Sequence, residues 1–91
     1  MNTVRVIIAD DHQLFIDGII SILSKELGIT IAGTANNGLE LLNLMESGSV
    51  PDIVITDIRM PILDGISVTR AIAKEYPNVH VLALSMYDQS M

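Results

Sequence analysis

The chain has 91 residues, of which 49% are hydrophobic, and a formal net charge of −6. This length allows one small domain with a thin core. The five basic residues are scattered singly, so the segment lacks the basic stripe that binds a nucleic-acid backbone. The absence of cysteine excludes disulfides and thiolate metal sites, and no apolar run reaches the roughly 18 residues of a membrane span. With no export signal at its start, the chain is expected to be a soluble, cytoplasmic protein.

Apolar runs of strand length alternate with amphipathic runs of helix length along the chain. Val4–Ala9 is continuously apolar apart from one arginine, which indicates a buried strand. From His12 to Leu27, polar residues recur at helical spacing, which predicts a helix that Gly28 closes. Ile29–Thr34 alternates more in character, as an edge strand does.

The second half repeats this alternation twice. Asn37 begins a capping-box pattern, which predicts a second helix that ends at Gly48. Ile53–Thr56 is the next apolar strand, and Asp64 is well placed to N-cap a third helix. After a helix-breaking proline, Val79–Leu84 reads as a fourth strand.

The order of the elements predicts an α/β fold with a parallel sheet and right-handed crossovers. An alternating second strand belongs at an edge, which favours the strand order 2-1-3-4 of flavodoxin-like folds, with helices on both faces. In that order the winding direction reverses between the first and third strands. Ligands of open α/β sheets bind outside the carboxyl ends of the strands at this point.

Carboxylates follow both strands at the point of reversal. Asp10 and Asp11 come after the first strand, and Asp57 comes after the third. Adjacent strands lie ~4.8 Å apart, so the three carboxylates must converge. Two like unit charges at 4 Å repel by about 4 kcal/mol at an effective dielectric near 20. A hard divalent cation such as Mg²⁺ would offset this repulsion, and the carboxylates would then be its ligands. The backbone carbonyl of Arg59 could add another oxygen, and Asp57 could attack a metal-held phosphoryl group to form an acyl phosphate.

Each of these residues also has a purely structural interpretation. Asp10 and Asp11 could be an N-cap pair for the first helix, and Asp57 could be a strand-end turn residue. Their coincidence at one switch point favours a functional role. Ser85 directly follows the last strand and could be either an ordinary loop serine or a part of the site.

Other residues near the strand ends are interpreted structurally. Asp64 is a helix cap rather than a ligand, and the Met60-Pro61 pair shapes the loop and delays the third helix. His12 and His80 have no partner histidines at ligand spacing, so they are interpreted as structural or surface residues.

Taken together, these motifs resemble the receiver domain of two-component response regulators. The matching elements are Asp10-Asp11, Asp57, Met60-Pro61, Asp64-Gly65 and Ser85. The stretches ADDHQLFIDGI and LALSMYD are similar to the NarL/FixJ class, whose output domain is a LuxR-type helix-turn-helix. The resemblance covers the chain from Val4 onward.

The resemblance implies a regulatory phosphoacceptor domain rather than an enzyme. Asp57 would accept a phosphoryl group from the phosphohistidine of a sensor histidine kinase. Asp10 and Asp11 would hold Mg²⁺ together with Asp57 and the carbonyl of Arg59, with Asp11 the more direct ligand. Ser85 would hydrogen-bond the phosphoryl oxygens, and the phosphorylated domain would control a DNA-binding output domain.

The sequence also departs from the family pattern. A receiver carries a lysine at the end of its fifth strand and a switch aromatic within that strand. Lys25 and Lys74 match neither position, and the chain ends at Met91. It is therefore interpreted as a single receiver domain over residues 1–91, truncated after the fourth strand and without its last helices and output domain. An uncovered fourth strand would leave an open apolar edge at Val79–Leu84, so self-association is expected.

Three other functions are compatible with parts of this pattern. A haloacid-dehalogenase phosphatase also uses a strand-end aspartate, but it needs a second aspartate two residues later, where this chain has Arg59. A mononucleotide-binding domain needs a glycine-rich turn after the first strand, which is absent from ADDHQLF. An interaction module that keeps the fold without accepting phosphate remains the open alternative.

Overall fold

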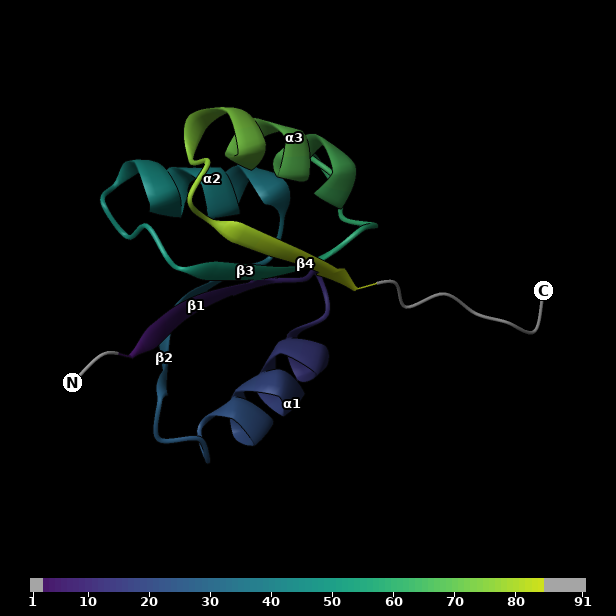
Figure 1. The fold of residues 1–91 in the computed structure, drawn as a ribbon. Helices are drawn as coiled ribbons and strands as arrows, with labels where there is room; N and C mark the ends of the chain where they lie inside the picture. Colours follow the sequence, from purple (N-terminus) through teal and green to yellow (C-terminus); the bar gives the residue numbers. More distant parts are fainter. Residues whose placement is uncertain (1–2, 85–91) are drawn as a thin grey trace.

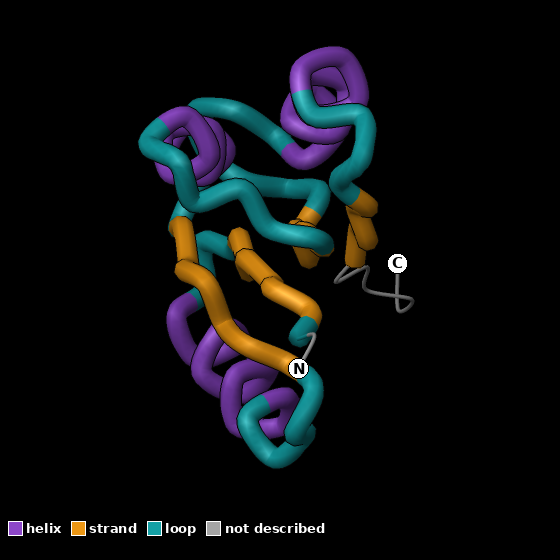
Figure 2. The backbone as a smooth tube through the Cα atoms, turned by 60° about the vertical axis from the view of Figure 1, so that its left-hand side comes forward, coloured by secondary structure: helices purple, strands orange, loops and turns teal. Residues whose placement is uncertain are grey.

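The computed structural model describes residues 3–84, which form a four-stranded parallel sheet with helices on both faces (Figure 1). The elements in chain order are β1 (Val4–Ala9), α1 (Gln13–Leu23), β2 (Ile29–Ala35), α2 (Gly38–Glu46), β3 (Ile53–Asp57), α3 (Gly65–Glu75) and β4 (His80–Leu84). The strand order is β2-β1-β3-β4, so the predicted 2-1-3-4 arrangement is confirmed. Figure 2 shows the sheet between α1 on one side and α2 and α3 on the other.

The two faces of the sheet bury alternate residues of β1. Val6 and Ile8 pack against Ile16 of α1, while Ile7 and Ala9 belong to the core beneath α2 and α3. This alternation follows from the two-residue period of a strand. A strand segment that is covered on both faces must be apolar at every position, which is why β1 is uninterruptedly apolar over its buried residues 6–9.

The helix caps agree largely with the sequence. The Asn37 side chain accepts a hydrogen bond from the Glu40 N–H at 2.9 Å, and the Asp64 side chain accepts one from the Ser67 N–H at 2.8 Å. The second arm of the capping box is displaced by one residue, because the Glu40 carboxylate accepts from the N–H of Asn36. Gly48, with φ 106°, follows the end of α2 as predicted.

The predicted extent of the first helix is wrong. α1 ends at Leu23, its cap is Ser24, and Leu27 is 96% exposed instead of packing on the apolar face. The pairing of β1 with β2 begins with Val4 and Ile29. The helix must therefore end early enough for the chain to reverse its direction before Ile29. Gly28 belongs to this turn, where its carbonyl accepts the N–H of Val4 at 2.8 Å.

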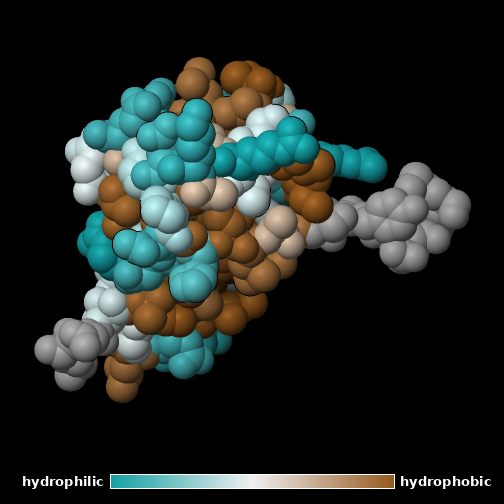
Figure 3. All heavy atoms as spheres, turned by 45° about the horizontal axis from the view of Figure 1, so that its top comes forward, coloured by the Kyte–Doolittle hydropathy of each residue, from teal (hydrophilic) through white to brown (hydrophobic). Residues whose placement is uncertain are grey.

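β4 pairs only with β3 within the described sheet, and Leu82 on it is 52% exposed. Apolar side chains also reach the surface across the middle of the face seen in Figure 3. Within residues 3–84, no helix is long and apolar enough to cross a bilayer.

Candidate metal centre

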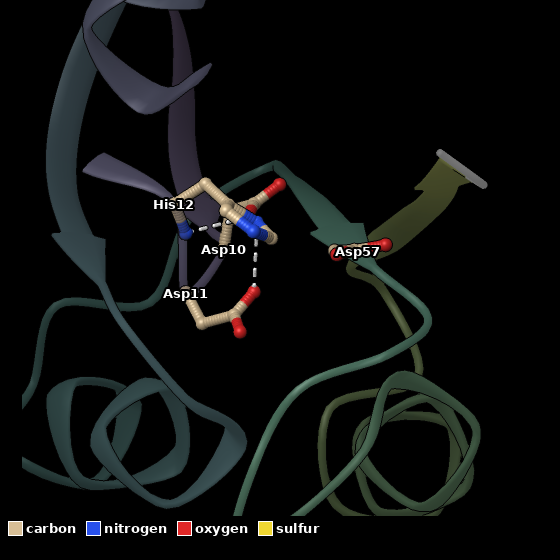
Figure 4. Close-up of side chains that lie close together, drawn as sticks. All are labelled: Asp10, Asp11, His12 and Asp57. Carbon is tan, nitrogen blue, oxygen red and sulfur yellow. Dashed lines mark hydrogen bonds and ion pairs between the residues drawn. The ribbon is translucent and has the colours of Figure 1, made fainter. Parts of the chain in front are cut away.

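The carboxyl ends of β1 and β3 bring three aspartates and one histidine together (Figure 4). Ala9 and Thr56 are paired in the sheet, so the residues that follow each of them emerge side by side. One ligating atom from each of Asp10, Asp11, His12 and Asp57 lies within 4.8 Å of all the others. The convergence predicted for the three carboxylates is therefore present in the fold.

Asp10 is completely buried and only partly satisfied. Its Oδ1 accepts the backbone N–H of His12 at 2.8 Å and lies 3.2 Å from the His12 Nδ1. Its Oδ2 is buried and has no hydrogen-bond partner among the described residues. Burial raises the pKa of Asp10 above its usual value, and the charge of Asp57 raises it further, although the two His12 hydrogen bonds oppose the rise.

His12 is an exposed side chain that nevertheless belongs to the cluster. Its Nδ1 lies 3.1 Å from Asp11 Oδ1 as well as 3.2 Å from Asp10 Oδ1, and 70% of its side chain is exposed. The hydrogen bond to Asp10 raises the pKa of His12, and the charge of Asp11 adds to this effect. The sequence interpretation as a surface residue missed this contact, although a histidine directly after two strand-end acids was a signal for it.

Asp57 ends β3 and is 5% exposed. Its Oδ1 accepts the N–H of Arg59 at 3.4 Å, which is a weak hydrogen bond. The sequence placed Asp57 just after the strand, whereas the structure makes it the last strand residue, paired with Leu84 of β4. The rigid sheet therefore positions its carboxylate directly.

The loop between β3 and α3 is folded against the strand end. Met60 is 8% exposed and belongs to the hydrophobic core, so its side chain anchors the loop to the core. The N–H of Gly65 donates to the carbonyl of Ile58 at 2.8 Å and closes the loop. The N–H of Leu63 donates to the carbonyl of Pro61 at 2.7 Å around Ile62, whose φ is 70°. This is a γ-turn with positive φ, a rare and strained conformation.

The other residues considered in the sequence analysis do not belong to this cluster of described residues. Asp64 caps α3, as expected. Lys25 follows α1 and Lys74 lies in the last turn of α3, both at the amino-terminal edge of the sheet, away from the acids. His80 is exposed on β4. Ser85 lies outside the described residues.

The residues present fit a hard divalent cation. Carboxylate oxygens are the ligands that Mg²⁺ prefers, and three carboxylates converge here. A buried oxygen without a donor is costly unless something satisfies it, and Asp10 Oδ2 is such an atom within the described part of the chain. A cation between these carboxylates would offset both their repulsion and this cost.

Comparisons with known proteins agree with this arrangement. The family profile of the response regulator receiver domain matches residues 6–91. The transcriptional regulatory protein DegU of Brevibacillus brevis is 37% identical over 87 residues, covering 96% of this chain and 36% of that protein. The receiver domain of the putative response regulator NarL from Mycobacterium tuberculosis has a TM-score of 0.89 at 34% identity, covering 98% of this chain and 71% of that one. RcsB of Salmonella typhimurium has a TM-score of 0.87 at 30% identity, covering 97% of this chain and 45% of that one. The chain thus spans less than half the length of the DegU and RcsB chains.

Proposed function

The chain belongs to the response regulator receiver family, in the NarL/FixJ class, and from this premise we propose that Asp57 is its phosphoacceptor. Receiver domains of this family are regulatory phosphoacceptors rather than enzymes. The observation that carries the proposal is the position of Asp57. It ends the strand next to β1 with its carboxylate within 4.8 Å of ligating atoms of Asp10 and Asp11.

The proposed chemistry is a single phosphoryl transfer. A carboxylate oxygen of Asp57 attacks the phosphorus of a phosphohistidine on a sensor kinase, forming a P–O bond as the P–N bond breaks. The bonding electrons and a proton go to the departing imidazole, and Asp57 becomes an acyl phosphate. Because the transition state is loose, the protein contributes mainly positioning and charge stabilisation. The sheet and the closed loop after Asp57 supply the positioning.

Asp10, Asp11, Asp57 and the backbone carbonyl of Arg59 would hold Mg²⁺, with Asp11 the more direct ligand. When bound, the ion would neutralise charge on the phosphoryl oxygens. Ser85 would hydrogen-bond those oxygens. The fully buried Asp10 supports this ligand set, since its Oδ2 has no donor in the described residues.

The wider role follows from the relatives. DegU is named as a transcriptional regulatory protein, so we propose that this receiver controls a DNA-binding output domain in the cytoplasm. Residues 1–91 are proposed to act as one receiver domain that does not itself contact DNA, consistent with their net charge of −6. Its partner would be a sensor histidine kinase.

The test is site-specific labelling. The 91-residue chain is incubated with acetyl phosphate and Mg²⁺, trapped with borohydride, and mapped by peptide mass spectrometry. Asp57 should be the modified residue, Asp57→Asn should abolish the modification, and Asp17→Asn on the exposed face of α1 should retain it. Circular dichroism establishes that each variant is folded. A folded chain without label would favour the phosphate-independent interaction module, and label that survives Asp57→Asn would assign the acceptor elsewhere.

A further inference from the structure

His12 completes a set of ligand atoms with the spacing found around one metal ion. Its Nδ1 lies 3.1 Å from Asp11 Oδ1 and 3.2 Å from Asp10 Oδ1. Adjacent ligands of an octahedral ion with bonds of about 2.1 Å lie about 3.0 Å apart, because their separation is the bond length times the square root of two. The Nδ1 atom therefore already lies at about the separation of a neighbouring ligand from each of these two oxygens.

A second observation points independently to a cation at this place. Asp10 is 0% exposed, and its Oδ2 has no hydrogen-bond partner within residues 3–84. A protonated His12 would satisfy only Asp10 Oδ1 and Asp11 Oδ1, which it already contacts. An ion in the cluster can also attract the unsatisfied Oδ2.

The type of ion follows from the nitrogen. Mg²⁺ selects oxygen ligands and retains several waters, whereas imidazole suits first-row transition ions. His12 is 70% exposed on its side chain, so its ring can turn toward an ion without disturbing the core. His12 is the N-cap residue of α1, and its side chain makes no capping hydrogen bond that metal binding would break.

We propose that His12 is a direct ligand in this centre, which makes it a mixed nitrogen and oxygen site that prefers divalent transition ions over Mg²⁺. The inference rests on the metal site of the proposed function but not on phosphoryl transfer. His12 would add selectivity, while the carboxylates would still accept Mg²⁺. The alternative is that His12 Nδ1 only hydrogen-bonds the two acids.

The experiment measures metal binding at pH 8, where imidazole is available as a ligand. Co²⁺ and Mg²⁺ affinities are measured by calorimetry, and ¹⁴N coupling to bound Mn²⁺ is measured by pulsed electron paramagnetic resonance. His12→Asn should lower the Co²⁺ affinity by about tenfold or more, change the Mg²⁺ affinity by less than about twofold, and remove the ¹⁴N signal. Asparagine is a good N-cap residue, so this variant should stay folded.

His80→Asn is the matched control, because His80 is the other histidine of the chain and is exposed on β4, outside the cluster. It should keep both the Co²⁺ preference and the ¹⁴N signal. The proposal is overturned if ¹⁴N coupling is absent from the wild-type chain or persists in His12→Asn. It is equally overturned if His12→Asn changes the two affinities alike. Labelling of Asp57 in the same samples shows separately whether the proposed function stands.

Discussion

Gly65 lies so close to Asp57 that a Cβ atom at Gly65 would overlap the backbone carbonyl oxygen of Asp57 and the Cα of Ile58. The start of α3 is therefore packed directly on the end of β3. This contact bears on the proposed chemistry, because the same strand end carries the carboxylate of Asp57, the proposed phosphoacceptor.

Gly65→Ala should destabilise the domain by about 2 kcal/mol or more, since the overlapping atoms are backbone that cannot turn away. It should also slow phosphoryl labelling by displacing Asp57. The matched control is Gly18→Ala in α1, where the added Cβ meets nothing within 4 Å. That change should raise helix stability by about 0.5–1 kcal/mol. Urea unfolding of both variants measures the difference, and equal effects would contradict the contact.

Ile62 is a β-branched residue in a left-handed conformation, with φ 70° and 75% exposure. Ile62→Gly should stabilise the domain by about 1 kcal/mol, because glycine adopts positive φ without steric cost and little packing is lost. Ile62→Val keeps the branched Cβ and should leave the stability nearly unchanged. Thermal unfolding distinguishes them, and a loss of stability in Ile62→Gly would show that this turn is not strained.

The buried Asp10 carboxylate is expected to lower the stability of the metal-free domain. Because burial raises the pKa of Asp10 in the folded state, the folded chain binds more protons than the unfolded chain between the usual value of 3.8 and the raised value. Stability without metal should therefore fall as pH rises through that window and stay level above it. Asp10→Asn keeps an oxygen for the His12 N–H and should remove this fall, so the metal-free Tm at pH 7, measured by thermal unfolding, should rise.

The same carboxylates should couple metal to stability. At ten times its Kd, Mg²⁺ should stabilise the wild-type chain by about 1.4 kcal/mol through mass action. Asp10→Asn and Asp11→Asn should lose most of this gain. Differential scanning calorimetry with and without Mg²⁺ measures it. An unchanged Tm in the folded wild-type chain would argue against the metal centre.

β4 pairs only with β3 among the described strands and carries the half-exposed Leu82. We expect the 91-residue chain to self-associate through this edge, because the outward N–H and C=O groups of β4, which pair with no other described strand, can pair with another chain. Leu82→Lys should reduce association, since lysine on an edge strand disfavours strand addition. Leu14→Lys, at an 86% exposed position of α1, is the control and should not. A monomer at all concentrations in light scattering would refute the expectation.

The sequence alone determined the architecture and the location of the site. The nearly continuous apolar run in Val4–Ala9 and the more alternating pattern in Ile29–Thr34 were enough to place one strand inside the sheet and the other at its edge. Because the side chains of a strand alternate between its two faces, strand burial can be predicted from neighbouring residues in the sequence. Once the strand order was inferred, Asp10, Asp11 and Asp57 had to meet, because parallel strands present their carboxyl ends at one edge.

The tertiary structure decided what depends on contacts between distant residues. α1 ends at Leu23 because the pairing of Ile29 with Val4 forces an earlier turn than the helical pattern indicates. Ile62 adopts positive φ in a loop that is closed between Ile58 and Gly65, against its own preference. The contact of His12 with both acids depends on side-chain direction at a sheet edge. The buried Asp10 oxygen that has no hydrogen-bond partner among residues 3–84 depends on burial at the same edge. Residue spacing specifies neither of these, because both are set by how separate strands and helices pack.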